Sequence, residues 1–371
     1  GCHPGGEMLG QQQDAGDDEV AVQDPGLDHR LAADAEREQT WLRVRLGWSR
    51  VLLGTRSSIF TPIADLGLVV VDEEHDPSFK QMEGFRYSAR DLAIVRGQRA
   101  GCPVLLGSAT PSLESLRNAL AGRYRHLCLD RRAGDAQGPQ VGLLDIRDQP
   151  LQSGLSHPLL DRVAATLDRG EQVILFLNRR GFAPVMSCYS CGWLSDCPRC
   201  DARQTLHKAS GLLWCHHCGA QRRVPARCPE CDADDLHPLG QGTEQLEGFL
   251  AERFAGVPLI RLDRDTTARR GSLERQLERL HRADAALLVG TQMLAKGHHF
   301  PRVTLVGVLD ADGGLFSADF RAAERMAQLL VQVAGRAGRG DRPGDVLIQT
   351  RYPDNPLLQT LVRRGYAAFA R

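Results

Sequence analysis

Eight of the eleven cysteines fall into four C-x-x-C pairs, and this spacing is typical of metal sites. The pairs are Cys188/Cys191, Cys197/Cys200, Cys215/Cys218 and Cys228/Cys231. A disulfide framework is typical of small secreted chains, whereas these pairs lie within a long chain in which no secretory signal is recognised. Zn²⁺ takes four thiolates at tetrahedral corners, and one C-x-x-C turn supplies two of them. Eight thiolates therefore predict two structural zinc ions with no open position for catalysis.

A second set of chemically useful residues follows an apolar run. Residues 66–71 read LGLVVV, and Asp72, Glu73, Glu74 and His75 come directly after them. A carboxylate at the end of a buried strand can hold Mg²⁺ beside a nucleotide, and a second one can orient the attacking water. The alternative is a solvated loop, which would suit an isolated Asp-Glu pair better than four polar residues after six apolar ones.

Further polar motifs follow other apolar runs in the same way. Gly107-Ser108-Ala109-Thr110 follows residues 103–106, and Gly290-Thr291-Gln292 with Lys296-Gly297 follows residues 285–289. Near the end of the chain, Gln332 precedes Arg336 and Arg339, which are three residues apart and so share a helical face. Arginines so placed suit the γ-phosphate of a nucleotide.

Alternating strand and helix patterns must position these residues. Continuous aliphatic runs predict buried parallel strands, with 66–71 as a fully buried one. Ligands of such sheets bind at the carboxyl ends of the strands, where the polar motifs lie. The prediction is an α/β protein with two lobes, the first incomplete, and a Cys-rich module inserted in the second. The expected boundaries are 1–40 for an acidic, disordered segment, 41–133 for the first lobe, 187–234 for the Cys-rich module, and 134–186 with 235–371 for the second lobe.

Charge and hydropathy narrow the class of protein. Residues 1–40 hold ten Asp or Glu and two Arg, so the remaining residues are mildly basic although the whole chain is neutral. A basic globular part permits a phosphate-bearing partner without requiring one. No stretch approaches the about 20 consecutive apolar residues of a membrane span, so no membrane partner is expected.

The order of the motifs resembles a superfamily 2 helicase motor built from two RecA-like lobes. The motifs are DEEH (72–75), GSAT (107–110), GTQMLAKGHHF (290–300) and QVAGRAGR (332–339). The chain is similar, more closely, to the PriA family of bacterial replication-restart helicases, also called primosomal protein N′. The similarity runs from about residue 41 to the last residue. The stretches that carry it, besides the four C-x-x-C pairs, are 53–62, 70–93, 174–184, 240–247 and 309–325.

The resemblance implies a role for each motif of the nucleotide site. Asp72 would hold Mg²⁺ and Glu73 would activate water, while Arg336 and Arg339 would be arginine fingers from the second lobe. The remaining motif residues would sense the nucleotide or couple its state to the DNA path: Glu74, His75, Ser108, Thr110, Gly290, Gln292, Lys296, Gly297 and Gln332.

The resemblance also implies a DNA-sensing loop and a zinc pairing. Six residues match the aromatic-rich loop of the family: Phe79, Lys80, Gln81, Phe85, Arg86 and Tyr87. Aromatic faces stack on bases and cations meet phosphates, and the alternative is a surface loop whose aromatic rings are buried. In the family the zinc pairs are nested, so Cys188, Cys191, Cys228 and Cys231 would hold one ion. Cys197, Cys200, Cys215 and Cys218 would hold the other.

The function implied is that of an ATP-dependent 3′→5′ DNA helicase that assembles the primosome at stalled forks. Its expected partners are ATP with Mg²⁺, single-stranded and forked DNA, primosome proteins and single-strand binding protein, in the bacterial cytoplasm.

The chain departs from the family because no G-x-x-x-x-G-K-[ST] phosphate loop occurs in the 371 residues. The family's amino-terminal DNA-binding domain and carboxy-terminal domain are also expected to be missing. Two alternatives follow: a truncated remnant that binds zinc and DNA without ATP turnover, and a zinc-ribbon nucleic-acid-binding module. An incomplete first lobe would expose apolar strands and be marginally stable.

Overall fold

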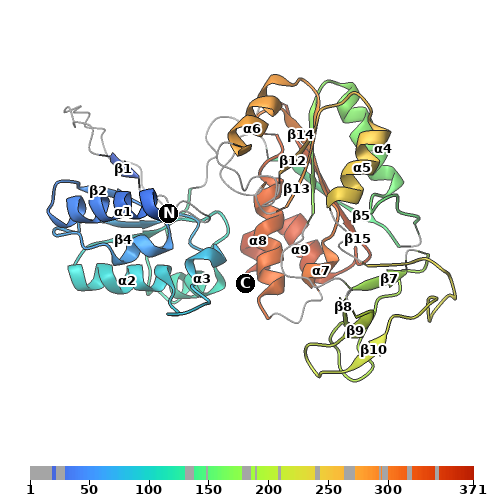
Figure 1. The fold of residues 1–371 in the computed structure, drawn as a ribbon, viewed down its shortest axis with the longest axis horizontal. Helices are drawn as coiled ribbons and strands as arrows, with labels where there is room; N and C mark the ends of the chain where they lie inside the picture. The colour runs from blue at the N-terminus through green and yellow to red at the C-terminus, as the bar shows by residue number, and fades with distance from the viewer. Residues whose placement is uncertain are drawn as a thin grey trace. The chain divides into compact units, whose positions relative to one another are not determined.

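A computed structural model gives the fold, and it divides the chain into two compact units, residues 1–111 and 112–371 (Figure 1). We describe each unit by itself. The structure describes residues 19–21, 30–129, 138–147, 149–177, 185–188, 190–207, 210–238, 243–262, 272–291, 294, 300–315, 320–338 and 342–371. None of the helices in these parts combines the length and apolar character needed to cross a membrane.

The first unit holds two short pairs of parallel strands. β1 pairs with β2, and β3 pairs with β4 in the register Val69↔Val104 to Val71↔Leu106. Its elements are β1 (Glu19–Ala21), α1 (Arg30–Arg45), β2 (Val51–Leu53), η1 (Arg56–Phe60), β3 (Val69–Val71), η2 (Pro77–Phe79), α2 (Ala89–Ala100) and β4 (Val104–Leu106).

The helix α2 anchors this unit. Ser88 caps its start by accepting a hydrogen bond from the Asp91 N–H at 3.3 Å, and Gly101 ends it with a left-handed φ of 66°. The Arg96 guanidinium donates to the carbonyl oxygens of Ile59 and Thr61, each at 2.6 Å. These bonds fasten the segment 53–62, which carried part of the family resemblance, to the helix.

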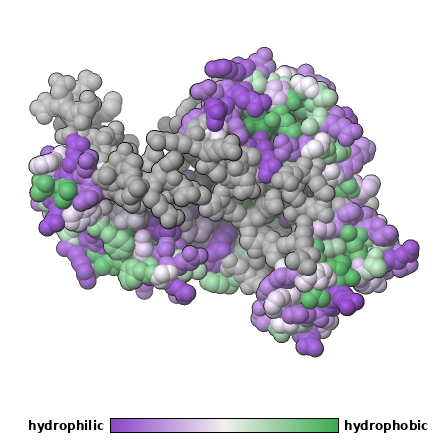
Figure 2. Space-filling view, in the orientation of Figure 1, coloured by the Kyte–Doolittle hydropathy of each residue, from purple (hydrophilic) through white to green (hydrophobic). Residues whose placement is uncertain are grey.

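Two expectations about the first unit are corrected. Residues 30–40 were expected to be disordered, but they lie in α1, whose sequence is rich in Ala, Leu, Glu and Arg, all strong helix formers. The run 66–71 was expected to be fully buried, yet Leu68 is 54% exposed and Val70 is 56% exposed. Among the described residues, β3 pairs with β4 alone, so too little protein surrounds this strand to bury both of its faces. Apolar patches interrupt the polar surface of the first unit in Figure 2.

The second unit is built on a six-stranded parallel sheet in the order β12-β13-β6-β14-β15-β5. Its strands are β5 (Gln140–Asp145), β6 (Gln172–Phe176), β12 (Leu259–Leu262), β13 (Ala286–Gly290), β14 (Val303–Val308) and β15 (Asp345–Thr350). Its helices are α3 (Leu113–Leu120), α4 (His157–Asp168), α5 (Thr243–Arg253), α6 (Ser272–Arg282), α7 (Asp312–Leu315), α8 (Ala322–Ala334), α9 (Pro356–Arg364) and α10 (Tyr366–Phe369).

Helices cover both faces of this sheet. Leu159 of α4 and Leu250 of α5 pack with Val173 and Leu175 on one face. Leu280 of α6, Leu330 of α8 and Leu358 of α9 pack with the opposite face. Every residue of β6, β13 and β14 is buried, as the continuous aliphatic runs predicted for a parallel sheet.

The Cys-rich module is inserted between β6 and β12 of this sheet. It contains β7 (Met186–Cys188), β8 (Thr205–His207), β9 (Leu212–Trp214), β10 (Gln221–Arg223) and β11 (Leu236–Pro238). β7 pairs with β11, and β8, β9 and β10 form a separate antiparallel sheet (Figure 1). The predicted α/β fold class, with a Cys-rich module inserted in the second lobe, is therefore confirmed.

Candidate nucleotide and zinc sites

The predicted carboxylates Asp72 and Glu73 lie directly after β3, at its carboxyl end. The Asp72 carboxylate accepts a hydrogen bond from the Glu73 N–H at 2.9 Å, and both side chains are exposed. Glu73 has a φ of 47°, in the left-handed region that a residue with a side chain seldom occupies. This turn leaves two accessible carboxylates at the carboxyl end of the strand, which suits them to bind Mg²⁺ and a water molecule.

Glu74 differs from its neighbours because it is buried. Its carboxylate pairs with the Arg90 guanidinium of α2 at 3.2 Å, and its N–H donates to the Gly107 carbonyl at 3.0 Å. Burial acts to lower the pKa of Arg90, but the carboxylates of Asp91 and Glu74 outweigh it and leave that pKa raised. Glu74 therefore ties the acidic turn to α2 and to the start of the GSAT motif. The sequence analysis missed Arg90.

His75 joins the acidic motif to the GSAT motif within the first unit. Its Nδ1 lies 2.7 Å from Ser108 Oγ and 3.6 Å from a Glu73 carboxylate oxygen. The Ser108 hydroxyl in turn accepts a hydrogen bond from the Thr110 N–H at 2.9 Å. A continuous polar contact thus runs from Glu73 through His75 and Ser108 to the buried Thr110.

Backbone hydrogen bonds join the two ends of the aromatic-rich loop, and its tip is exposed to solvent. Lys80 and Ser88 form an antiparallel bridge, and the Gln81 N–H donates to the Tyr87 carbonyl at 2.8 Å. Tyr87 packs edge-on against Phe60 with ring centroids 4.8 Å apart, whereas Phe85 is 76% exposed. Phe79 is half-buried and Arg86 is exposed. The alternative of a loop with buried aromatic rings is therefore wrong for Phe85.

The predicted site residues of the second unit are described in part. Arg336 is buried two residues after the end of α8, Gln332 is half-buried within α8, and Gly290 ends β13. A Cβ at Gly290 would lie 2.4 Å from the Leu262 carbonyl oxygen, so this close approach of β12 and β13 requires glycine. Gln292, Lys296, Gly297 and Arg339 lie outside the described residues.

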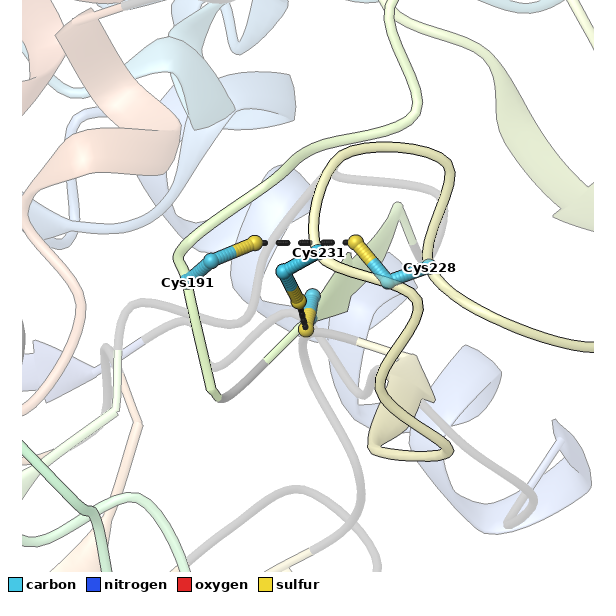
Figure 3. Close-up of side chains that lie close together, drawn as sticks. Cys191, Cys228 and Cys231 are labelled. Atoms are coloured by element: carbon cyan, nitrogen blue, oxygen red, sulfur yellow. Dashed lines mark hydrogen bonds between the residues drawn. The ribbon is translucent and has the colours of Figure 1, made fainter.

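The eight paired cysteines form two separate clusters. Four ligand sulfurs in each cluster lie within 4.8 Å of one another. The first cluster is Cys188, Cys191, Cys228 and Cys231, shown in part in Figure 3, and the second is Cys197, Cys200, Cys215 and Cys218. These are the nested sets that the resemblance implied. Facing sulfurs lie 3.5 to 3.7 Å apart, close to the about 3.8 Å expected across a tetrahedron with Zn–S bonds of about 2.3 Å.

Tight turns place the sulfurs of each pair side by side. In three of the four pairs, the residue after the second cysteine has a left-handed φ, at Gly192 (81°), Gly219 (77°) and Asp232 (55°). The N–H of each of these residues donates to the carbonyl oxygen of the first cysteine of its pair, at 2.8 to 3.0 Å.

Crowding of the thiols changes their acidity. Burial, followed by hydrogen bonding among the four thiols, raises the pKa of Cys191 to about 12. The N–H groups of Cys218 and His217 help lower the pKa of Cys215 to about 6. Four thiols that repel one another when ionised and converge on one centre are suited to a dication such as Zn²⁺, because the metal ion relieves this repulsion.

The Cys-rich module meets the parallel sheet at residues that the sequence analysis did not single out. The Arg351 side chain, just after β15, lies against Gly192, where a Cβ would be 2.6 Å from a guanidinium nitrogen. Asp312 of α7 accepts hydrogen bonds from the Arg351 N–H at 2.9 Å and from the Thr350 hydroxyl. Burial raises the pKa of Asp312, although Thr350 and Arg351 act to lower it. This junction connects the first cysteine cluster to the end of β15.

A second junction unnoticed in the sequence joins α3 to α8 within the second unit. The buried Glu324 accepts a hydrogen bond from the Leu113 N–H at 2.9 Å and pairs with Arg321 at 3.2 Å. Arg321 also pairs with Glu114 of α3. Arg321 and Glu324 both lie in the stretch 309–325 that carried part of the family resemblance. Their position against α3 could not be predicted from their spacing in the sequence.

Comparison with known proteins places the chain in a family. The family described as PriA DNA helicase Cys-rich region (CRR) domain matches residues 197–223, and the Helicase conserved C-terminal domain matches residues 239–341. Replication restart protein PriA of Haemophilus influenzae is 52% identical over 92% of this chain and 47% of that protein. PriA of Bacillus subtilis is 42% identical over 95% of this chain and 43% of that protein.

A solved structure is also similar. The DEAD-box helicase Mss116, bound to ssRNA and UDP-BeF, aligns with 95% of this chain and 57% of that chain, at 12% identity and a TM-score of 0.49. The chain spans about half the length of the curated relatives that it matches. Over the part that it spans, the chain belongs to the PriA family of replication restart proteins.

Proposed function

We propose that this chain is the motor part of an ATP-driven 3′→5′ DNA helicase that acts in replication restart. The observation that carries the proposal is the polar contact from Glu73 through His75 to Ser108, which joins two helicase motifs within the first unit. The names of the PriA relatives supply the setting of replication restart.

The nucleotide chemistry would divide among a few residues. Asp72 would hold Mg²⁺, which favours carboxylate oxygens and neutralises phosphate charge, and Glu73 would orient the attacking water. Arg336 and Arg339 would stabilise the charge that develops on the transferred phosphoryl group. His75 and Ser108 would pass the state of the nucleotide to the GSAT segment.

The proposed DNA contacts begin at the aromatic-rich loop. Phe85 and Arg86 at its exposed tip present a ring to a base and a cation to a phosphate. Single-stranded and forked DNA are the proposed substrates, with primosome proteins and single-strand binding protein as partners. The two cysteine clusters would bind structural zinc.

A second candidate function is a zinc- and DNA-binding protein without ATP turnover. It is favoured by the lack of a G-x-x-x-x-G-K-[ST] motif in the 371 residues, because that loop normally cradles the phosphates of ATP. A zinc-ribbon nucleic-acid-binding module is a narrower form of this candidate.

The test is ATP hydrolysis by the zinc-loaded chain, with and without single-stranded DNA. DNA-stimulated turnover that Glu73→Gln abolishes would support the motor. DNA binding without turnover would support the second candidate. A chain that neither binds single-stranded DNA nor hydrolyses ATP would contradict both. Asp91→Asn, which changes an exposed carboxylate outside the motif, is the matched control for Glu73→Gln.

A further inference from the structure

The three-stranded sheet of the Cys-rich module has one face turned to solvent. In the register of β8, β9 and β10, Trp214 lies between Thr205 and Gln221, and Leu212 lies between His207 and Arg223. Residues paired in this way share a face of the sheet. Trp214, Gln221 and Arg223 on this face are exposed, whereas Leu213 on the opposite face is fully buried.

Aromatic rings gather on the solvent face. Trp214 is 38% exposed and stacks on His216, with ring centroids 5.3 Å apart and planes 22° apart. His207 lies 5.1 Å from the Trp214 ring, and its Nε2 is 3.2 Å from His216 Nε2. The three rings therefore brace one another, so the indole is held in place while part of it remains open to solvent.

Each face of the three-stranded sheet has an arginine near a tryptophan, but the two arginines differ in their contacts. On the inner side, the Arg222 guanidinium lies 5.6 Å from the centre of the Trp193 ring and also donates to Gln204. Arg223, on the solvent face, is a diagonal neighbour of Trp214 across β9 and β10, and the Cα atoms of such neighbours are typically about 7–8 Å apart. One arginine–tryptophan pair is thus used for internal packing, and the other is presented outward.

The charge of this segment suits an anionic ligand. Residues 197–223 contain five Arg or Lys and one Asp, and the segment stays positive when four thiolates and one Zn²⁺ are counted. An exposed ring for stacking and a cation on the same face are the two features with which proteins hold single-stranded nucleic acid: the ring stacks on a base, and the positive charge meets the backbone. Figure 2 shows apolar and polar side chains adjoining one another on the surface of the Cys-rich module.

We propose that the solvent face of β8, β9 and β10 binds single-stranded DNA, with one base stacked on Trp214 and a neighbouring phosphate at Arg223. This inference rests on the proposed DNA-binding function and adds a site separate in sequence from the aromatic-rich loop. Because every base has a stackable face, the site would tolerate any sequence.

The test is binding of a fluorescein-labelled oligo(dT) to the zinc-loaded full chain, followed by anisotropy. Trp214→Ala is expected to weaken binding about tenfold, and Trp214→Phe to retain most of it, because phenylalanine keeps a stacking face. Arg223→Ala is expected to weaken binding and to lower the slope of log affinity against log salt by about one. Trp48→Ala and Arg227→Ala, which remove an exposed tryptophan and an exposed arginine outside this face, are the matched controls.

Three outcomes separate this inference from the function on which it rests. Parent binding that Trp214→Ala leaves unchanged would overturn the inference alone. A parent chain that does not bind oligo(dT) would contradict DNA binding itself. If Trp214→Ala loses zinc, its DNA affinity no longer reports on stacking alone. The test then rests on the affinities of Trp214→Phe and Arg223→Ala and on photocrosslinking of an oligonucleotide that contains 5-iodouracil. Crosslinks at Trp214 or His216 are expected, and crosslinks confined to residues outside the Cys-rich module would overturn the inference.

Discussion

The strands of the two units are made from similar residues but differ in burial. β13 in the second unit reads ALLVG and is buried throughout, whereas β3 in the first unit reads VVV and leaves Val70 56% exposed. β13 has a paired strand on each side and helices over both faces, while among the described residues β3 pairs with β4 alone. Aliphatic composition therefore indicates that a strand can be buried, and the number of its neighbours decides whether it is.

The Cys-rich module adds a third way of holding strands together. The small apolar cluster beside its three-stranded sheet contains Cys197, Cys215 and Ala220, so cysteines that would bind metal also make up its core. Removing zinc is expected to unfold β8, β9 and β10, because structural zinc supplies about 10–16 kcal/mol in comparable small sites. The six-stranded sheet, which has its own apolar core, should persist. Hydrogen exchange with and without a chelator measures the stability of both sheets. If the six-stranded sheet lost its protection together with β8, β9 and β10, it would not be independent of zinc and this expectation would be wrong.

Matched valine substitutions test the comparison between the two units. Val289→Ala in β13 should lower the free energy of unfolding by about 2–3 kcal/mol, because it leaves a cavity in a packed core. Val70→Ala in β3 should cost less than about 1 kcal/mol, since that side chain is already half in water. Denaturant unfolding followed by a probe in each unit gives both values. Equal costs would show that β3 is covered in solution.

A pair of glycine substitutions tests the junction between the Cys-rich module and the sheet. Gly192 and Gly219 both have left-handed φ angles, but only Gly192 has a neighbour, Arg351, within 4 Å of its would-be Cβ. Each change to Ala should lower the free energy of unfolding by about 1 kcal/mol, because alanine is strained at a left-handed φ. Gly192→Ala should cost about 0.5–1 kcal/mol more than Gly219→Ala, because the new methyl group would also meet Arg351. Combining it with Arg351→Ala should remove the difference. Thermal unfolding of the zinc-loaded chain measures these shifts.

The smallest expected effect concerns Asp310, a partly buried residue two positions after the end of β14. Burial raises the pKa of Asp310, and the nearby Asp312 carboxylate raises that pKa further. The hydrogen bond that Asp310 accepts from the Gly313 N–H acts to lower it but does not outweigh the burial. A raised folded-state pKa means that ionised Asp310 destabilises the fold above that pKa and that this cost disappears as the pH falls below it. Asp310→Asn should therefore stabilise the chain slightly at pH 7, and the gain should shrink at lower pH. Melting temperatures from pH 5 to pH 8 check this, and a gain independent of pH would contradict it.

Local pattern predicted much of the fold. The runs 103–106 and 285–289 became β4 and β13 with ends shifted by at most one residue, because parallel strands are continuous aliphatic segments. The burial of 66–71 was predicted wrongly, because neighbouring strands are set by tertiary structure and not by the run itself. Residues 1–40 were assigned to disorder as one acidic segment, although the helix formers of residues 30–40 place those residues in α1.

The site was predictable where its residues lie close together in the sequence. C-x-x-C spacing reveals zinc ligands because the two sulfurs come from one turn. The contact of Arg351 with Gly192 joins residues 159 positions apart and arises only once the Cys-rich module folds back on the sheet. Nothing in the local sequence at either position signals it.

The place of the Cys-rich module between β6 and β12 has a consequence for synthesis. β6 lies at the middle of the six-stranded sheet, and both of its neighbours, β13 and β14, come after the insertion. At about 5–20 residues per second, the ribosome takes roughly 5–20 s to pass from Phe176 to Ala286. During that interval β6, which is buried throughout in the folded sheet, waits for its partner strands while the Cys-rich module is being made. A nascent chain that captures zinc early would shorten the loop that β6 and β13 must close, so metal supply would affect the yield of folded protein as well as its final stability.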